Sequence, residues 1–203
     1  MLKKTIALML ALVLAVSLCA CETVLKPFTP GTVANNHYES TYAGVACQLD
    51  SDWTFMTDEQ IRQNNEQTMD MMGEDYAAAL EKATVITDMF ATHANQMDTV
   101  HVSFEKLSGV NMALTAEAYA QISAKAAADG LTAIGVENAT YEIGKIQFAG
   151  SEHTAIRIEG VYAGISVYET IALRKTGNYM MLVASCTWYE NTTEAVLANF
   201  TKI

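Results

Sequence analysis

The sequence predicts an α+β fold: a single domain built on an antiparallel β-sheet that is flanked by helices. The last third of the chain carries short runs of alternating apolar and polar residues, separated by glycine-containing turns, which is typical of consecutive hairpins. Helical patterns occur before, between and after these strands, without the regular strand–helix alternation of a parallel sheet. Together these observations favour helices packed on an antiparallel sheet.

The first part of the domain is expected to be extended and then helical. Residues 38–49 are predicted to be extended with a bend near Gly44, because apolar residues recur there at the period of a strand. Thr57 and Gln60 have the spacing of a capping box, so a helix is predicted from Thr57. A second short helix is expected over residues 75–82.

The middle of the domain predicts two strands and the longest helix. A strand is expected over residues 84–90 and another over 99–107, where His101 falls among the alternate, solvent-facing positions. The helix is predicted to begin at Thr115 and to end at Gly135, which tolerates the left-handed conformation. Its apolar residues at helical spacing are expected to be buried: Tyr119, Ile122, Ala126 and Ile134.

The last third is predicted to be a meander of strands followed by a helix. Turns are expected where glycines interrupt the alternation, one of them at Gly144. The strands are predicted over residues 141–143, 145–149, 154–162, 165–175 and 179–188. A final helix is expected over residues 192–202, burying Val196, Leu197 and Phe200.

The start of the chain has the layout of a bacterial lipoprotein signal. Two lysines precede an apolar run over residues 5–20, which is shorter than the roughly 20 residues that a membrane-spanning helix needs. Leu18-Cys19-Ala20-Cys21 then resembles the lipobox, in which a diacylglyceryl group is attached to the cysteine and a peptidase cuts before it. Two acyl chains anchor a protein firmly, whereas one does so only marginally. The alternative is an ordinary secretory signal that leaves Cys21 free.

This layout divides the chain into three parts. Residues 1–20 are expected to be the signal peptide, and residues 21–37 the lipidated N-terminus with a flexible tether, since Pro27 and Pro30 lie there beside Gly31. Residues 38–203 are expected to form the domain. The protein is therefore predicted to be held at the cell membrane on the extracytoplasmic side.

Composition excludes some partners. The formal net charge is −11 and becomes −13 once the leader with its two lysines is removed. Such an acidic domain is a poor partner for nucleic acid and is repelled by anionic lipid headgroups, so membrane contact is expected through the anchor. No cofactor is expected, and the protein is predicted to be a monomer.

The cysteines of the domain leave two possibilities open. Cys47 and Cys186 each lie in an apolar segment that is predicted to be a strand. Export would permit a disulfide between them. Buried free cysteines are equally natural, because a thiol packs as a small hydrophobic group.

Two stretches carry a resemblance to a known group. They are residues 53–59, Trp-Thr-Phe-Met-Thr-Asp-Glu, and the region from Phe148-Ala149-Gly150 to Gly177-Asn178-Tyr179-Met180. The chain resembles small secreted domains of Firmicutes that are similar to Mog-type Ran-binding proteins and to the PsbP subunit of the photosynthetic oxygen-evolving complex. The resemblance implies an α/β/α sandwich with an antiparallel sheet. It implies no catalytic residues, because the known members are binding or assembly proteins.

No catalytic or metal-binding motif is found in the sequence. The histidines His37, His93, His101 and His153 lack metal-ligand spacing, and a zinc site would have to be assembled from distant residues. Ser151, Glu152 and His153 are adjacent at a predicted hairpin turn. Because neighbouring residues of a strand point to opposite faces, Glu152 is not expected to orient His153 as the acid of a catalytic triad does.

One residue breaks the apolar pattern of its strand. Glu169 lies among Ile165, Val167, Ile171 and Leu173, on the face that is expected to be buried. A carboxylate on such a face is costly unless it is paired, so a β-bulge or a salt bridge to Arg157 or Arg174 is one explanation. The other is a functional site, for which Glu169 is a weak candidate with an unusual pKa.

The sequence therefore favours a lipid-anchored, non-catalytic binding or assembly module with a protein or cell-surface partner. An envelope hydrolase with an unrecognised active site is one alternative. A small-ligand carrier is another, and it would need a pocket between a helix and the sheet.

Overall fold

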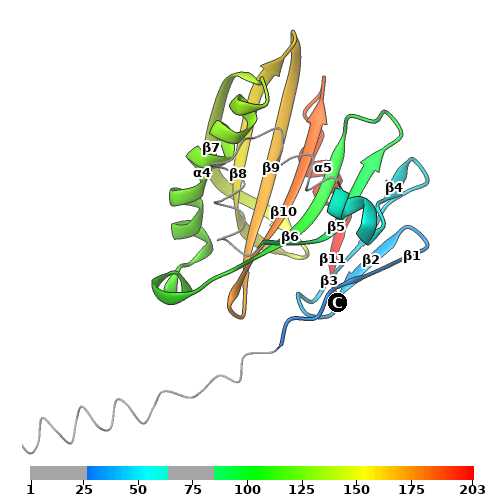
Figure 1. Ribbon diagram of the computed structural model, residues 1–203, viewed down its shortest axis with the longest axis vertical. Coiled ribbons are helices and arrows are strands. Elements are labelled where there is room, and N and C mark those ends of the chain that lie inside the picture. Colours follow the sequence, from blue (N-terminus) through cyan, green and yellow to red (C-terminus); the bar gives the residue numbers. More distant parts are fainter. Residues whose placement is uncertain (1–26, 64–84) are drawn as a thin grey trace, which may run out of the picture.

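Two antiparallel sheets face each other, and a long helix covers the outer face of the larger sheet (Figure 1). The computed structural model describes residues 27–63 and 85–203, to which all structural statements refer. The antiparallel sheet with flanking helices is as expected.

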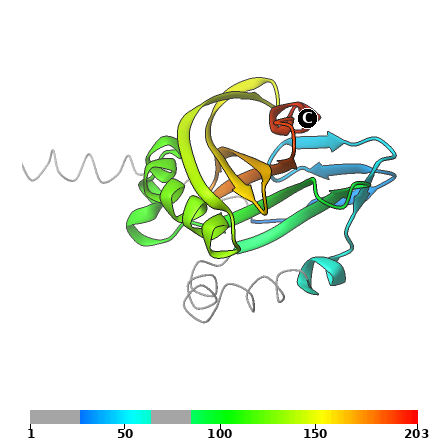
Figure 2. The ribbon, with the colours of Figure 1, turned by 90° about the horizontal axis from the view of Figure 1, so that it is seen from above.

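The smaller sheet has four strands in the order β1-β2-β3-β11. Their bounds are Thr32–Ala34, His37–Ser40, Val45–Gln48 and Phe200–Lys202. The larger sheet has seven strands in the order β4-β5-β6-β10-β9-β8-β7. These are β4 Trp53–Phe55, β5 Val85–His93, β6 Thr99–Lys106, β7 Glu137–Phe148, β8 Ser151–Tyr162, β9 Ile165–Thr176 and β10 Tyr179–Trp188. The larger sheet curves strongly, so that β7 and β8 bend away from β5 and β6 (Figure 2).

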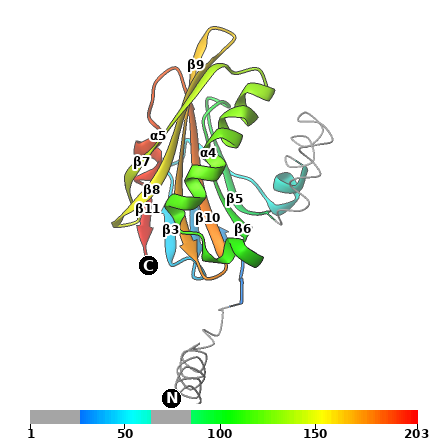
Figure 3. The ribbon, with the colours of Figure 1, turned by 90° about the vertical axis from the view of Figure 1, so that its left-hand side faces the viewer.

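Helices lie on both faces of the larger sheet. The long helix α4, Ala116–Ala133, packs on β7, β8 and β9 (Figure 3). The short helix α5, Thr193–Leu197, packs on β9 and β10 from the side of the smaller sheet. A 3-10 turn, η1 Gly109–Ala113, precedes α4, and residues 58–63 form the described part of another helix.

Two apolar cores hold these layers together. The core between the sheets joins Tyr38, Val45 and Cys47 of the smaller sheet to Phe104, Met181 and other buried residues of the larger one. The core under α4 joins its small residues to Ile156, Ile158, Leu173 and Met180. Burial of apolar surface on both faces of the larger sheet explains why its central strands are so rich in apolar residues.

Local signals placed most elements correctly. The capping box is present, since the Gln60 N–H donates to the Thr57 hydroxyl over 3.3 Å and the Thr57 N–H to the Gln60 side chain over 2.8 Å. Thr115 caps α4 by accepting from the Ala118 N–H, and Gly135 follows α4 with φ +101°. The strands predicted at 84–90, 99–107 and in the meander are confirmed as β5, β6 and β7 to β10. The helix expected over residues 75–82 lies outside the described residues.

The buried face of α4 differs from the predicted one. Tyr119 is buried as expected, but Ile122 is 63% exposed and Ile134 38% exposed, and Ala126 is also exposed. The residues that contact the sheet are instead Ala120, Ala124 and Ala128. Small side chains let the helix approach the sheet closely. The prediction was wrong because it assigned the larger apolar side chains to the buried face.

Two glycines act differently from the prediction. At Gly44, with φ +66°, the chain reverses fully, so residues 38–49 form the hairpin β2–β3 rather than one bent extension. At Gly144 the strand β7 continues without a break. A Cβ atom there would lie 2.7 Å from Nη1 of Arg157, so a larger residue would displace the guanidinium.

The structure at the two ends of the domain also differs from the prediction. The chain is folded from residue 28 onward: the Phe28 ring packs between Tyr42, Phe104 and Tyr179, and β1 pairs with β2, so residues 28–37, which were expected to belong to a flexible tether, are part of the folded domain. The final helix is only α5, after which Phe200 pairs with Cys47 in β11. The edge of β3 supplies backbone partners that outweigh local helical preference. Leu197 and Phe200 are buried as expected.

Candidate functional site

A half-open polar hollow lies on the larger sheet beside α5. Its volume is about 290 Å³. It is lined by residues of β7, β8 and β9 and of the segment between β10 and α5: Thr140, Tyr141, Glu142, Arg157, Ile158, Glu159, Glu169, Thr170 and Asn191. Most of these residues are polar, which sets the hollow apart from the two apolar cores.

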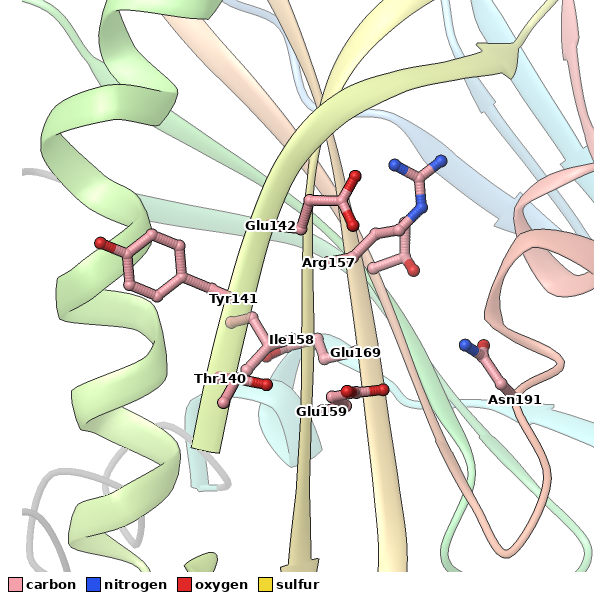
Figure 4. A pocket seen from close by; sticks show the side chains of 9 residues that line it. Thr140, Tyr141, Glu142, Arg157, Ile158, Glu159, Glu169 and Asn191 are labelled. Carbon is pink, nitrogen blue, oxygen red and sulfur yellow. The ribbon is translucent and has the colours of Figure 1, made fainter. Parts of the chain in front are cut away.

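Strand alternation decides which of these side chains face the hollow. Glu142, Arg157 and Thr170 are register partners across three strands and share one face with Glu159. Figure 4 shows the Glu142, Arg157 and Glu159 side chains on the side of Asn191, whereas Tyr141 points toward α4. Tyr141, Ile158 and Glu169 form the adjacent register row, so their side chains belong to the α4 face.

Arg157 forms a fixed wall of the hollow. Its Nε donates to Oε1 of Glu194 on α5 over 2.7 Å, and its Nη2 donates to the Lys145 carbonyl over 2.8 Å. Nη2 also lies 2.6 Å from Glu194 Oε1. The guanidinium therefore ties α5 to β7 and β8, and its charge is largely matched by Glu194.

The base of the hollow is held by buried hydroxyl groups. The Thr170 and Thr193 hydroxyls lie 2.8 Å apart, and Thr193 donates to the Asn191 side chain over 2.8 Å. Glu142 and Glu159 take part in no hydrogen bond or ion pair with any described residue. With Arg157 matched by Glu194, these two carboxylates leave the hollow negatively charged and open to a ligand with cationic or hydrogen-bond donor groups.

Glu169 has the unusual pKa that its sequence position suggested. It is half-buried on the α4 face, and burial raises its pKa from 4.5 to about 7. Neither structural explanation holds. The β8–β9 register is unbroken from Thr154 to Tyr162, and Arg157 and Arg174 lie on the opposite face. Among the described residues the Glu169 carboxylate has no hydrogen-bond or ion-pair partner. Its register partner on β10 is Cys186.

The two cysteines of the domain are free, so the possible disulfide is not formed. Cys47 belongs to the core between the sheets, whereas strand alternation places Cys186 on the α4 face with Met180 and Ala184. The larger sheet therefore separates the two sulfur atoms. Burial raises the pKa of each thiol to about 12, which keeps both in the unreactive protonated form.

The histidines do not converge on a site. No group of three or more histidine, cysteine or acidic side chains within residues 27–63 and 85–203 is placed to hold a metal ion. His101, expected to face solvent, is half-buried, and its ring stacks on that of Phe90 with the ring centroids 5.6 Å apart. Burial lowers the pKa of His101 to about 4. His37 contacts Gln48, and His93 packs against Trp53.

Ser151 and His153 lie closer together than the sequence indicated. Ser151 Oγ is 2.8 Å from His153 Nε2 at the start of β8, and the ring packs edge-on against Phe148. Burial lowers the pKa of His153, and so do the positive charges of Arg174 and Lys145. A general base must become an imidazolium, which these cations oppose. Glu152 is on the opposite face of the strand, as expected.

An unpredicted polar contact lies at Asp88. Its carboxylate accepts the Gly31 N–H on both oxygens, at 3.0 and 2.9 Å, and the Tyr38 hydroxyl at 2.6 Å. Asp88 is the extra residue where the β5–β6 register shifts. The contact fastens the N-terminal segment to the larger sheet. An aspartate inside an apolar strand was the available signal.

Comparison with known proteins found no relative: no family model matches the chain, and no curated protein matches it.

Proposed function

We propose that this protein is a lipid-anchored extracytoplasmic module that binds a partner without catalysis. The observation that carries the proposal is the position of Cys21, which ends an apolar leader after a small residue and lies six residues before the first described residue, Pro27. A diacylglyceryl group on Cys21 would hold the protein at the outer side of the cell membrane. None of the helices in residues 27–63 and 85–203 is long and apolar enough to cross a bilayer.

The polar hollow is the proposed binding site. Glu142 and Glu159 have no partner among the described residues, while Arg157 and the buried threonines keep the surrounding strands and α5 in place. Such a preorganised surface suits recognition of a cationic or donor-rich group on a protein or cell-surface partner. A volume near 290 Å³ is at the low end for enclosed small-ligand pockets, which favours a surface partner over a carried ligand.

A hydrolase is the second candidate, because Ser151 and His153 are within hydrogen-bonding distance. The cations near His153 and the position of Glu152 count against this activity. A fluorophosphonate probe tests it: labelling of the wild type that is lost in Ser151→Ala and kept in Ser166→Ala would establish a nucleophile. Absence of labelling removes this candidate.

The anchor is tested by intact mass measurement of protein purified from bacterial membranes. The expected product begins at Cys21 and carries the mass of the lipid. Cys21→Ala should abolish attachment of the lipid. Cys19→Ala, two residues earlier, should leave the lipid attached. Unmodified protein released into the medium would refute the proposal.

The binding site is tested by cross-linking capture from solubilised envelope. A specific partner should be captured by the wild type and by the control Glu137→Gln/Glu190→Gln, and lost with Glu142→Gln/Glu159→Gln. Equal capture by both double variants would exclude the hollow, and repeated failure to capture a partner would count against a binding module.

We also propose that the fold is related to that of the Mog and PsbP proteins, with an α/β/α arrangement of layers. The support is an antiparallel sheet with α4 on one face and α5 on the other. In this chain the four-stranded sheet covers much of the second face. An experimental structure aligned with members of that group tests the relationship.

A further inference from the structure

Several turns that are far apart in the sequence meet at one end of the domain, the lower end in Figures 1 and 3. The Tyr42 hydroxyl donates to the Thr176 carbonyl over 3.2 Å, which joins the β2–β3 turn to the β9–β10 turn. Lys175 Nζ donates to the Met112 carbonyl over 2.5 Å, which brings η1 to the same place. We call this surface, formed by residues 41–44, 106–113, 149–152, 174–178 and 202–203, the lower end.

The chain enters the fold at the lower end. Phe28 packs against Tyr42 and Tyr179 there, at centroid distances of 5.1 and 5.2 Å. From Cys21 to Pro27 the chain has six residues, which reach about 20 Å at most when fully extended. This step rests on the proposed lipid anchor. With Cys21 held in the bilayer surface, the lower end is the part of the domain that the tether keeps nearest to the lipid.

Charge is distributed unevenly between this end and the rest of the domain. The lower end and the strand ends beside it carry most of the described cationic side chains: Lys106, Lys145, Arg174, Lys175 and Lys202. The other described cations are Arg62, Lys125 and Arg157, and each is paired with a glutamate or an aspartate. Acidic side chains gather at the opposite end of the strands and in its loops: Asp50, Asp52, Asp98, Glu137, Glu159 and Glu190.

The acidic groups of the lower end are few and partly engaged. They are Glu39 beside the β2–β3 turn, Asp88, which accepts from the Gly31 N–H and the Tyr38 hydroxyl, Glu105, which accepts from the Tyr119 hydroxyl, Glu117 in the first turn of α4, and Glu152. The cations and acids there are equal in number, whereas the whole chain has a net charge of −11. The repulsion by anionic headgroups expected from the net charge is therefore weaker at this end than at the acidic end.

The lower end also presents apolar side chains to solvent. Val110 is 90% exposed and Met112 46% exposed, and both lie on η1, which Lys175 holds through the Met112 carbonyl. Two exposed apolar side chains beside lysines are the combination that binds the interface of an anionic bilayer.

We propose that the lower end rests on the anionic surface of the membrane, with Val110 and Met112 in the headgroup layer and the lysines beside the lipid phosphates. The polar hollow lies further along β7, β8 and β9, toward the acidic end. In this orientation the hollow is held away from the lipid, and the acidic end projects furthest from it.

Depth-dependent fluorescence quenching tests the orientation. The lipidated full chain is reconstituted into vesicles of phosphatidylglycerol and phosphatidylcholine in equal parts, with doxyl-labelled lipid as the quencher. Val110→Trp introduces a tryptophan at the lower end, and Ile122→Trp is the matched control at an exposed apolar position on the outer face of α4. The native Trp53 and Trp188 lie at the far end of their strands and serve as internal controls.

We expect quenching in Val110→Trp well above that of the wild type, and no increase in Ile122→Trp. Lys106→Glu/Lys202→Glu should reduce the quenching of Val110→Trp, whereas Arg62→Glu/Lys125→Glu should not. For unlipidated Cys21→Ala protein, partitioning onto the same vesicles at low salt should fall by at least about fivefold for each lysine reversed, because each lost positive charge removes about 1 kcal/mol and the new carboxylate adds repulsion. Far-UV circular dichroism of each variant establishes that it is folded.

The two proposals fail in different ways. An unlipidated mass for the protein purified from membranes refutes the anchor, and the tether argument with it. A lipidated protein in which Val110→Trp and Ile122→Trp are quenched equally, or in which the Lys106/Lys202 and Arg62/Lys125 variants behave alike, keeps the anchor and overturns the orientation.

Discussion

Replacing Glu169 by glutamine should stabilise the protein above pH 7. Glu169 is half-buried without a partner among the described residues, and its pKa is about 7 in place of 4.5. The folded state therefore keeps this proton over a pH range in which the unfolded state has lost it. Between pH 4.5 and 7 the folded state binds more protons than the unfolded state, so this carboxyl lowers the free energy of unfolding as the pH rises.

The size of the effect follows from the difference between the two pKa values. One pKa unit corresponds to about 1.4 kcal/mol, so the difference between 4.5 and about 7 sets an upper limit of about 3.5 kcal/mol. Partial exposure of the side chain reduces this figure to about 1–2 kcal/mol. Glu169→Gln has nearly the same shape and no charge. It should match the wild type near pH 4 and exceed its stability by about 1–2 kcal/mol at pH 8.

His101 acts in the opposite direction over nearly the same pH range. Burial lowers its pKa from 6.5 to about 4, so the folded state binds fewer protons than the unfolded state between these values. Its contribution to stability is present above pH 6.5 and is lost as the pH falls. The two groups largely cancel in the wild type. Glu169→Gln should therefore show stability rising from pH 4 to 6.5, and His101→Gln should show stability falling from pH 4.5 to 7.

Urea unfolding across this pH range, together with an NMR titration of the glutamate carboxyl carbons, measures both effects. Glu159→Gln on the neighbouring strand also removes one carboxylate; it is the control for the change in net charge and should not reproduce the gain in stability of Glu169→Gln. A titration midpoint of Glu169 near 4.5, or a lower stability of Glu169→Gln than of the wild type at pH 8, would refute the reasoning.

Three further predictions concern the contacts that hold the fold. Asp88→Ala leaves the buried Tyr38 hydroxyl and the Gly31 N–H unpaired, so urea unfolding should show a loss of about 3 kcal/mol, with a smaller loss in Tyr38→Phe. Thr115→Ala removes the cap of α4 and should cost about 1 kcal/mol, whereas Thr192→Ala, at a position without a side-chain cap bond, should cost less. Cys47 and Cys186 should react with a thiol reagent only after unfolding; unchanged thiol counts with and without reductant check that they are unpaired.

Elements with strong local signals were predicted well. The meander follows from glycine turns between alternating runs, and the turns at Gly150 and Gly164 have the positive φ that such hairpins need. The starts of two helices follow from Thr57 and Thr115, whose hydroxyls bind N–H groups only three residues away. Signals of this kind involve neighbours in the chain, so they need no knowledge of the fold.

The errors arose where a distant segment changed the outcome. Residues 200–202 were predicted to be helical, but the edge of β3, more than a hundred residues earlier, makes them a strand. Phe28 and β1 were likewise predicted to lie in a tether, but β1 pairs with β2 and Phe28 packs against the aromatic core. For His101, the stacked Phe90 on the adjacent strand turns an expected solvent position into a half-buried one.

The candidate site could be predicted only in part. Glu169 was found because a carboxylate interrupts an apolar stripe, which is visible within one strand. The hollow was not found, because its polar residues come from three strands and a loop, and each is unremarkable in its own segment. Asp88 was missed for a related reason, since its partners Gly31 and Tyr38 lie at least fifty residues away.

The amino-acid sequence alone was enough to predict the antiparallel meander and the capped helices and to propose the anchor at Cys21, because each depends on side chains and backbone within a few residues. The folded molecule was needed to learn which stripe of α4 is buried, that the two thiols lie on opposite sides of a sheet, and that lysines between positions 106 and 202 share one end of an acidic domain. Those features depend on how strands distant in the chain are paired and curved, and pairing is set by burial of the whole core rather than by any single segment.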